Sequence, residues 1–179
     1  MGEIVDRKTE FSTPWFELIS KRVANDPAPF YSLRMLDYVA VVAFTPADEI
    51  ILVRQYRPAV ERFTLELPSG HVEKDEPPAE SARRELAEEC GFEAPQVELI
   101  GTLLSDTGRN ENRLWAYFAG VVSPLATGYL PEAGVERVLL PRMKLADLLA
   151  KGEFDFGLHV AVLMLAILKH GGGVIGLKS

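Results

Sequence analysis

The segment from Gly70 to Phe92 constrains the fold more than any other part of the chain, because it defines a helix and the side that this helix buries. It reads GHVEKDEPPAESARRELAEECGF. Asp75 is expected to cap the helix, the two prolines that follow are tolerated in its first turn, and Gly91 ends it. Small and apolar residues recur along it at helical spacing, namely Ala79, Ala82, Leu86 and Cys90. This stripe predicts that the helix packs against a sheet.

The strand pattern around this helix predicts a mixed domain. Tyr38–Phe44 is an almost unbroken apolar run rich in valine, which suits a strand buried on both faces. The turn residues at 46–49 predict a hairpin into a second strand. Strands are expected at 15–23, 50–55, 63–67, 97–104, 114–122 and 135–140, and helices at 143–151 and 157–170. Because strands come in runs with helices inserted and appended, we predict an α/β or α+β domain rather than a regular βαβ repeat.

Composition and charge limit the classes of function. A length of 179 residues suits one domain, and a formal net charge of −7 argues against a general nucleic-acid binder. The single cysteine, Cys90, excludes an intrachain disulfide and agrees with a reducing compartment. The longest apolar stretch, 158–168, is shorter than the roughly 20 residues of a membrane span, and the charged N-terminus lacks a signal-peptide core. We expect a cytoplasmic protein with neither a membrane nor a nucleic-acid partner.

Three carboxylates crowd the same helix. Glu85 and Glu89 are four residues apart and lie one above the other, and Glu88 flanks Glu85, so all three share an arc of about 100° beside the buried stripe. A solvated helix face, or pairing with Arg83 and Arg84, is the structural alternative. A cluster of carboxylate oxygens indicates a hard cation, Mg²⁺ or Mn²⁺, rather than zinc.

The segment resembles the Nudix hydrolase box, G-x5-E-x7-R-E-U-x-E-E-x-G-U, in which U is apolar. The matching residues are Gly70, Glu76, Arg84, Glu85, Leu86, Glu88, Glu89, Gly91 and Phe92. The resemblance implies a Nudix-type α/β/α sandwich with a mixed β-sheet over residues 37–179. It also implies a strand-forming N-terminal segment, residues 1–36, which serves dimerisation and base stacking in relatives. We therefore expect a homodimer, with Trp15, Phe30 and Tyr31 either in that contact or in core packing.

The resemblance also implies roles for the box residues. Metal ligands would be Ser69, through its carbonyl, together with Glu85, Glu88 and Glu89. Arg84 would steady the glutamates, and Glu76 would brace the loop against the helix. His71 would lie close to substrate without a role in the reaction.

The flanks of the box resemble those of ADP-ribose pyrophosphatases and related nucleoside-diphosphate-sugar hydrolases. Arg57, in VRQYR, matches an arginine that reaches the diphosphate, a task that suits the guanidinium fork. Arg54 is a second substrate-binding candidate or a surface charge, and Glu66 contacts substrate or caps the loop. After the box, Thr107 stands where the subfamily has proline, which leaves a broader sugar specificity open.

A hydrolase needs a base or a metal-bound hydroxide to activate water. In relatives the base is often a glutamate on a late loop, and here the first choice is Glu132. Glu136, Glu111 and Glu89 are alternatives, and Glu111 is also a candidate substrate contact. The expected reaction is Mg²⁺-dependent hydrolysis of ADP-ribose or a related nucleotide sugar to a nucleoside monophosphate and a sugar phosphate. Hydrolysis of damaged nucleoside triphosphates, or nucleotide binding without catalysis, remains the alternative.

Overall fold

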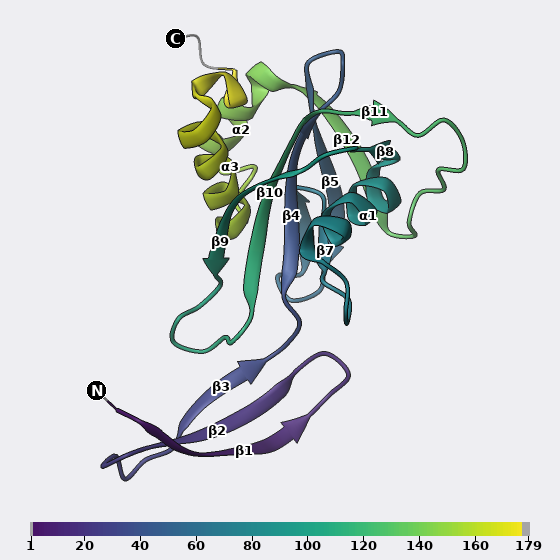
Figure 1. Cartoon of the computed structure of the whole chain (residues 1–179). Coiled ribbons are helices and arrows are strands. Elements are labelled where there is room, and N and C mark those ends of the chain that lie inside the picture. Colours follow the sequence, from purple (N-terminus) through teal and green to yellow (C-terminus); the bar gives the residue numbers. More distant parts are fainter. Residues whose placement is uncertain (1, 177–179) are drawn as a thin grey trace.

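Two main sheets organise the chain, and the computed structural model describes residues 2–176 of it (Figure 1). The N-terminal sheet is antiparallel in the order β1-β2-β3. Its strands are β1 (Ile4–Ser12), β2 (Glu17–Val23) and β3 (Phe30–Arg34). In Figure 1 this sheet lies below the rest of the molecule, with neither of its faces covered by a helix. The boundary that we predicted between residues 36 and 37 stays a prediction.

The larger sheet has seven strands and runs in the order β12-β5-β4-β10-β9, with β6 paired to β5 and β7 to β4. The strands are β4 (Tyr38–Phe44), β5 (Glu49–Arg57), β6 (Arg62–Glu66), β7 (Ser69–His71), β9 (Glu98–Leu104), β10 (Arg113–Val121) and β12 (Val135–Pro141). β4 and β10 are parallel and the other pairs are antiparallel, so the sheet is mixed. A short ladder joins β8 (Phe92–Glu93) to β11 (Ser123–Pro124).

Helices cover both faces of this sheet. α1 (Pro78–Cys90) lies on one face, and α2 (Leu145–Lys151) and α3 (Gly157–His170) lie on the other (Figure 1). Two 3-10 turns, Arg142–Lys144 and Gly172–Ile175, flank the last two helices. The predicted α/β/α sandwich with a mixed sheet is confirmed.

The central strand β4 shows why both faces need cover. Val39, Val41 and Ala43 belong to the apolar cluster shared with α1. The alternating residues Ala40, Val42 and Phe44 belong to the cluster shared with α3. Because successive side chains point to opposite faces, an unbroken apolar run is buried only between two layers.

The helix α1 begins differently from our expectation. Asp75 has a φ of 66° and lies in the turn before the helix, and the N-cap is Pro77, without a side-chain hydrogen bond. The prediction that Asp75 caps the helix was therefore wrong, because Asp75 lies two residues before the N-cap, in a left-handed turn. Gly91 does end the helix, in the left-handed conformation at a φ of 72°.

The helix α3 fixes the connection between β6 and β7. The backbone N–H of Leu67 donates to Nδ1 of His159, 3.0 Å away, and this ring is fully buried. Burial lowers the pKa of His159 to about 4, so the ring is neutral and Nδ1 accepts the bond. The segment that leads into Ser69 and Gly70 is thus tied to the far layer of the sandwich.

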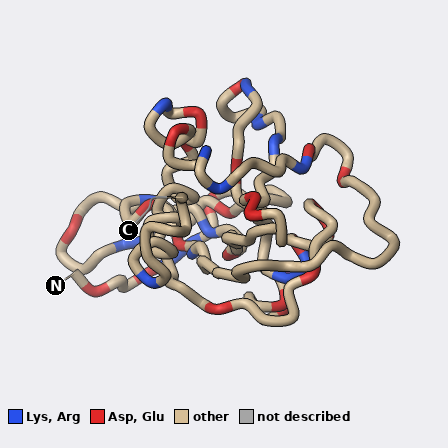
Figure 2. The backbone as a smooth tube through the Cα atoms, turned by 90° about the horizontal axis from the view of Figure 1, so that it is seen from above, with Lys and Arg blue, Asp and Glu red and all other residues tan. Residues whose placement is uncertain are grey.

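None of the helices within residues 2–176 combines the length and the apolar character that a membrane crossing requires. Figure 2 shows Lys and Arg interspersed with Asp and Glu along the backbone of these residues.

Candidate active site

A cavity of about 1140 Å³ opens between α1, the strands β5 to β7 and the segment before β12. Most of the residues that the sequence singled out line it, namely Arg57, Glu66, Ser69, Glu85, Glu88, Glu89 and Glu132. His71 lines it as well, as expected of a residue close to substrate. Three candidates, Arg54, Glu111 and the alternative base Glu136, are not among the lining residues.

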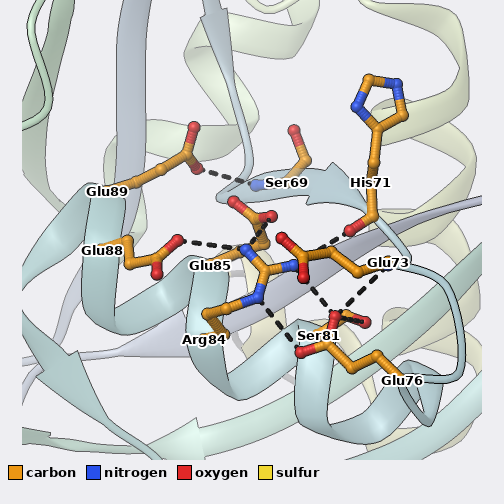
Figure 3. Close-up of polar contacts among 9 residues, drawn as sticks. All are labelled: Ser69, His71, Glu73, Glu76, Ser81, Arg84, Glu85, Glu88 and Glu89. Atoms are coloured by element: carbon orange, nitrogen blue, oxygen red, sulfur yellow. Dashed lines mark hydrogen bonds and ion pairs between the residues drawn. The ribbon is translucent and has the colours of Figure 1, made fainter.

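Arg84 is the hub of the polar contacts on α1 (Figure 3). Its Nη1 donates to Glu85 Oε1 at 2.7 Å and to Glu88 Oε2 at 3.0 Å. Its Nε and Nη2 donate to the two oxygens of Glu76, each at 3.1 Å, and Nη2 also donates to the His71 carbonyl at 3.0 Å. The hydrogen bond from Arg84 lowers the pKa of Glu76 to about 2. Arg84 thus joins the segment between β7 and α1, which contains Glu76, to the helix α1.

Glu89 lies outside this hub. Its side chain points away from Arg84, and its Oε2 accepts the backbone N–H of Ser69 at 2.9 Å (Figure 3). Only 4% of Glu89 is exposed, and burial raises its pKa to about 8, with the nearby charges of Glu85 and Glu132 adding to the effect. Burial also raises the pKa of Glu85. For Glu85 and Glu89, burial therefore outweighs the positive charges of Arg84 and Arg57, which favour the ionised carboxylates.

Gly70 is needed because of Glu85. A Cβ at position 70 would collide with the carboxyl group of Glu85. A flexible side chain can move aside, but this carboxyl group is also held by Arg84. Gly70 thus leaves room for the carboxyl group of Glu85 beside β7.

The residues present fit a hard divalent cation. Within residues 2–176 no three acidic, His or Cys side chains already surround a common point. The reason is visible in Figure 3, where Glu85 and Glu88 turn to Arg84 while Glu89 turns to Ser69. The donors are all oxygens, and a cation would favour the ionised form of carboxylates that burial disfavours.

Arg57 is held in place by the buried carboxylate of Glu66. Its Nε and Nη2 donate to the two oxygens of Glu66 at 2.8 and 2.7 Å. Glu66 is 2% exposed, and Thr64 Oγ1 donates to it at 2.6 Å, whereas the Arg57 side chain is 43% exposed. Nη1 of Arg57 has no protein partner among residues 2–176. This two-bond pair orients the guanidinium of Arg57.

Arg54 and Glu111 have structural partners instead. Arg54 Nη1 is 3.1 Å from Glu136 Oε2 across the β5–β12 pair, and its guanidinium lies over Phe63. Glu111 accepts from Lys21 and Ser32, each at 2.6 Å, and so ties the N-terminal sheet to the loop before β10. The geometry brings neither of them to the cavity.

Tyr129 is one of the lining residues that sequence reasoning missed. The hydroxyl of Tyr129 donates to the backbone carbonyl of Glu89 at 2.9 Å. Tyr129 belongs to a loop without hydrophobic periodicity, so no pattern in the sequence indicates its contact with α1.

With this geometry established, comparison with known proteins identifies the family. The family model described as the NUDIX domain matches residues 35–156. The chain belongs to the Nudix family. A solved structure described as the crystal structure of an ADP compounds hydrolase superposes with a TM-score of 0.79 at 24% identity, over 97% of this chain and 96% of that one. That similarity supports the Nudix fold.

Two curated relatives illustrate the range of this Nudix chain's similarity. It is 38% identical to a methanol dehydrogenase activator from Bacillus methanolicus over 81 residues. These residues make up 45% of this chain and 44% of that protein. It is 37% identical over 87 residues to an ADP-ribose pyrophosphatase from Bacillus subtilis, 49% of this chain and 47% of that protein. The matches thus span about half the length of these relatives.

The pair between Arg57 and Glu66 yields a stability prediction for the Nudix domain. Replacing Glu66 with Gln removes the buried charge that both guanidinium bonds need, and we expect the free energy of unfolding to fall by about 2 kcal/mol. Glu136→Gln is the matched control, because it breaks an exposed pair and is expected to change stability by about 0.5 kcal/mol or less. Urea unfolding of both variants measures the difference, and equal losses would contradict the role given to Glu66.

Proposed function

We propose that this protein is a Mg²⁺-dependent hydrolase that cleaves the diphosphate linkage of ADP-ribose or a related nucleoside diphosphate sugar. The products are a nucleoside monophosphate and a sugar phosphate. The observation that carries the proposal is the convergence of the box glutamates and the anchored Arg57 on one cavity. The relative named ADP-ribose pyrophosphatase supports the same substrate class.

The cation would be held by Glu85, Glu88, Glu89 and the Ser69 carbonyl. When bound, Mg²⁺ or Mn²⁺ supplies Lewis-acid stabilisation of the charge that develops on the phosphate oxygens. Arg57 presents a fixed guanidinium to the diphosphate, and its pair with Glu66 removes the need to order it during the reaction. The two carboxylate oxygens of Glu66 accept from Arg57 and leave the guanidinium's outer edge for substrate.

Glu132 is the proposed general base. It lines the same cavity as Glu85 and Glu89, and it belongs to a loop rather than to the metal-binding helix. A carboxylate that is not committed to the cation is free to take a proton from the attacking water. Glu89 is the alternative base, but its backbone bond to Ser69 occupies one of its oxygens.

The first test is turnover of ADP-ribose with Mg²⁺, with AMP identified as a product. We expect Glu89→Gln to lower kcat at least about 100-fold, because it weakens both the cation site and the local charge balance. Glu80→Gln, on the exposed side of the same helix, is the matched control and is expected to keep wild-type turnover.

Two results would contradict the proposal. Equal turnover by the wild type and Glu89→Gln would exclude a catalytic role for the proposed metal site on α1. Hydrolysis of nucleoside triphosphates without release of AMP from ADP-ribose would exclude the nucleotide-sugar class.

We also infer a homodimer in which a second copy covers the N-terminal sheet. That sheet and its β1–β2 turn expose large apolar side chains, Phe11 of β1 at 59% and Trp15 of the turn at 76%, while few apolar residues of the sheet, such as Ile19, are buried. A three-stranded sheet needs a packed face for stability, and an identical sheet supplies one with matching chemistry.

Light scattering during gel filtration tests this assembly. We expect a mass of twice 19.8 kDa for the wild type. Replacing Phe11 and Trp15 together with Ser is expected to shift the protein to the monomer mass, because the apolar contact is lost. A wild-type monomer at micromolar concentration would contradict the inference.

A further inference from the structure

The loop at residues 125–134 closes one side of the cavity and carries Glu132. It follows the short strand β11 and ends where β12 begins to pair with β5. Its lining residues are Leu125, Gly128, Tyr129, Leu130 and Glu132. Leu130 is 83% exposed, so the loop has little apolar packing of its own.

Two hydrogen bonds join this loop to the end of α1. The backbone N–H of Leu125 donates to the Gly91 carbonyl at 2.9 Å. The hydroxyl of Tyr129 donates to the Glu89 carbonyl at 2.9 Å. The last four carbonyls of a helix lack partners within the helix, so they accept bonds from elsewhere. The end of α1 is therefore a ready acceptor for the loop.

The ring of Tyr129 fits its position because residue 91 is glycine. A Cβ at this position would lie 2.5 Å from Cγ of Tyr129 and 2.8 Å from both Cδ atoms. Arg137 lies beside the ring, with its guanidinium 5.0 Å from the centroid, and donates to the Cys90 carbonyl at 2.8 Å. The helix end, the ring and Arg137 thus form one packed contact.

Glu132 lies close to this contact along the chain. Three residues span at most about 11 Å from Tyr129, which restricts where the Glu132 backbone can go. On the other side, the Val135 N–H donates to the Glu132 carbonyl at 3.1 Å, and Val135 is already paired with Gln55 of β5. The segment that carries Glu132 is therefore held at both ends.

We propose that Tyr129 is a positioning residue, which anchors the 125–134 loop on Gly91 and the Glu89 carbonyl and so holds Glu132 at the cavity. The catalytic consequence rests on the proposed hydrolase function, whereas the anchoring itself does not. Gly91 then has two tasks, since it ends α1 and also provides the surface on which Tyr129 packs.

Hydrogen exchange tests the anchoring without any substrate. In Tyr129→Ala we expect the Leu125 amide and its loop neighbours to exchange about tenfold faster or more, while the amides of α1 and β12 keep their protection. Tyr129→Phe keeps the ring and removes only the hydroxyl bond, so its exchange rates should lie between those of the wild type and Tyr129→Ala. Thr127→Ala, an exposed change in the same loop, is the control. Unchanged protection in Tyr129→Ala would overturn the proposal.

A double-mutant cycle tests the link to Glu132. We expect Tyr129→Ala to lower kcat about tenfold in the wild type with a smaller change in KM, and to have almost no effect in a Glu132→Gln background. An equal loss in both backgrounds would overturn the link, because Tyr129 would then act on α1 alone. If the wild type hydrolyses no nucleotide sugar, the proposed function fails, and the exchange experiment still decides the anchoring.

Discussion

The burial of acidic side chains on one helix is the constraint on which the site depends. Glu85 and Glu89 lie on α1 next to the stripe that packs on the sheet, and they are 8% and 4% exposed. A buried carboxylate requires hydrogen-bond donors or a cation, otherwise it takes up a proton. Arg84 supplies donors to Glu85, and the Ser69 N–H supplies one to Glu89. The neighbouring loop, strand and helix end are arranged around this requirement.

Several surroundings of the helix follow from that arrangement. Gly70 lacks a side chain because Glu85 occupies the space, and His159 holds the segment before Ser69 from the opposite layer. Arg57 is oriented by a separate buried carboxylate, Glu66. The helix thus provides an acidic surface, and strand β5 provides the guanidinium of Arg57, which Glu66 holds in place. The two together suit a phosphate-containing ligand.

The sequence predicted α1, the two-sided burial of β4 and the three glutamates of α1 that line the cavity, because each leaves a periodic or compositional signal. It did not predict β1, whose residues are nearly all exposed and which is held by main-chain bonds to β2. Arg54 and Glu111 were candidates for substrate binding, and the structure pairs them with Glu136 and Lys21, partners that depend on strand pairing and loop contacts. Tyr129 was missed because its ring packs on Gly91, far away in the sequence, and such a contact produces no periodic pattern of residues.

Binding of Mn²⁺ in the absence of substrate tests the cation requirement most directly. Free Mn²⁺ gives an electron paramagnetic resonance signal that disappears on binding, so a titration yields affinity and stoichiometry. We expect saturable binding by the wild type, at least about tenfold weaker binding by Glu85→Gln, and unchanged binding by Glu80→Gln. Failure of the wild type to bind, or equal affinity in Glu85→Gln, would contradict the metal-binding role of the buried carboxylates.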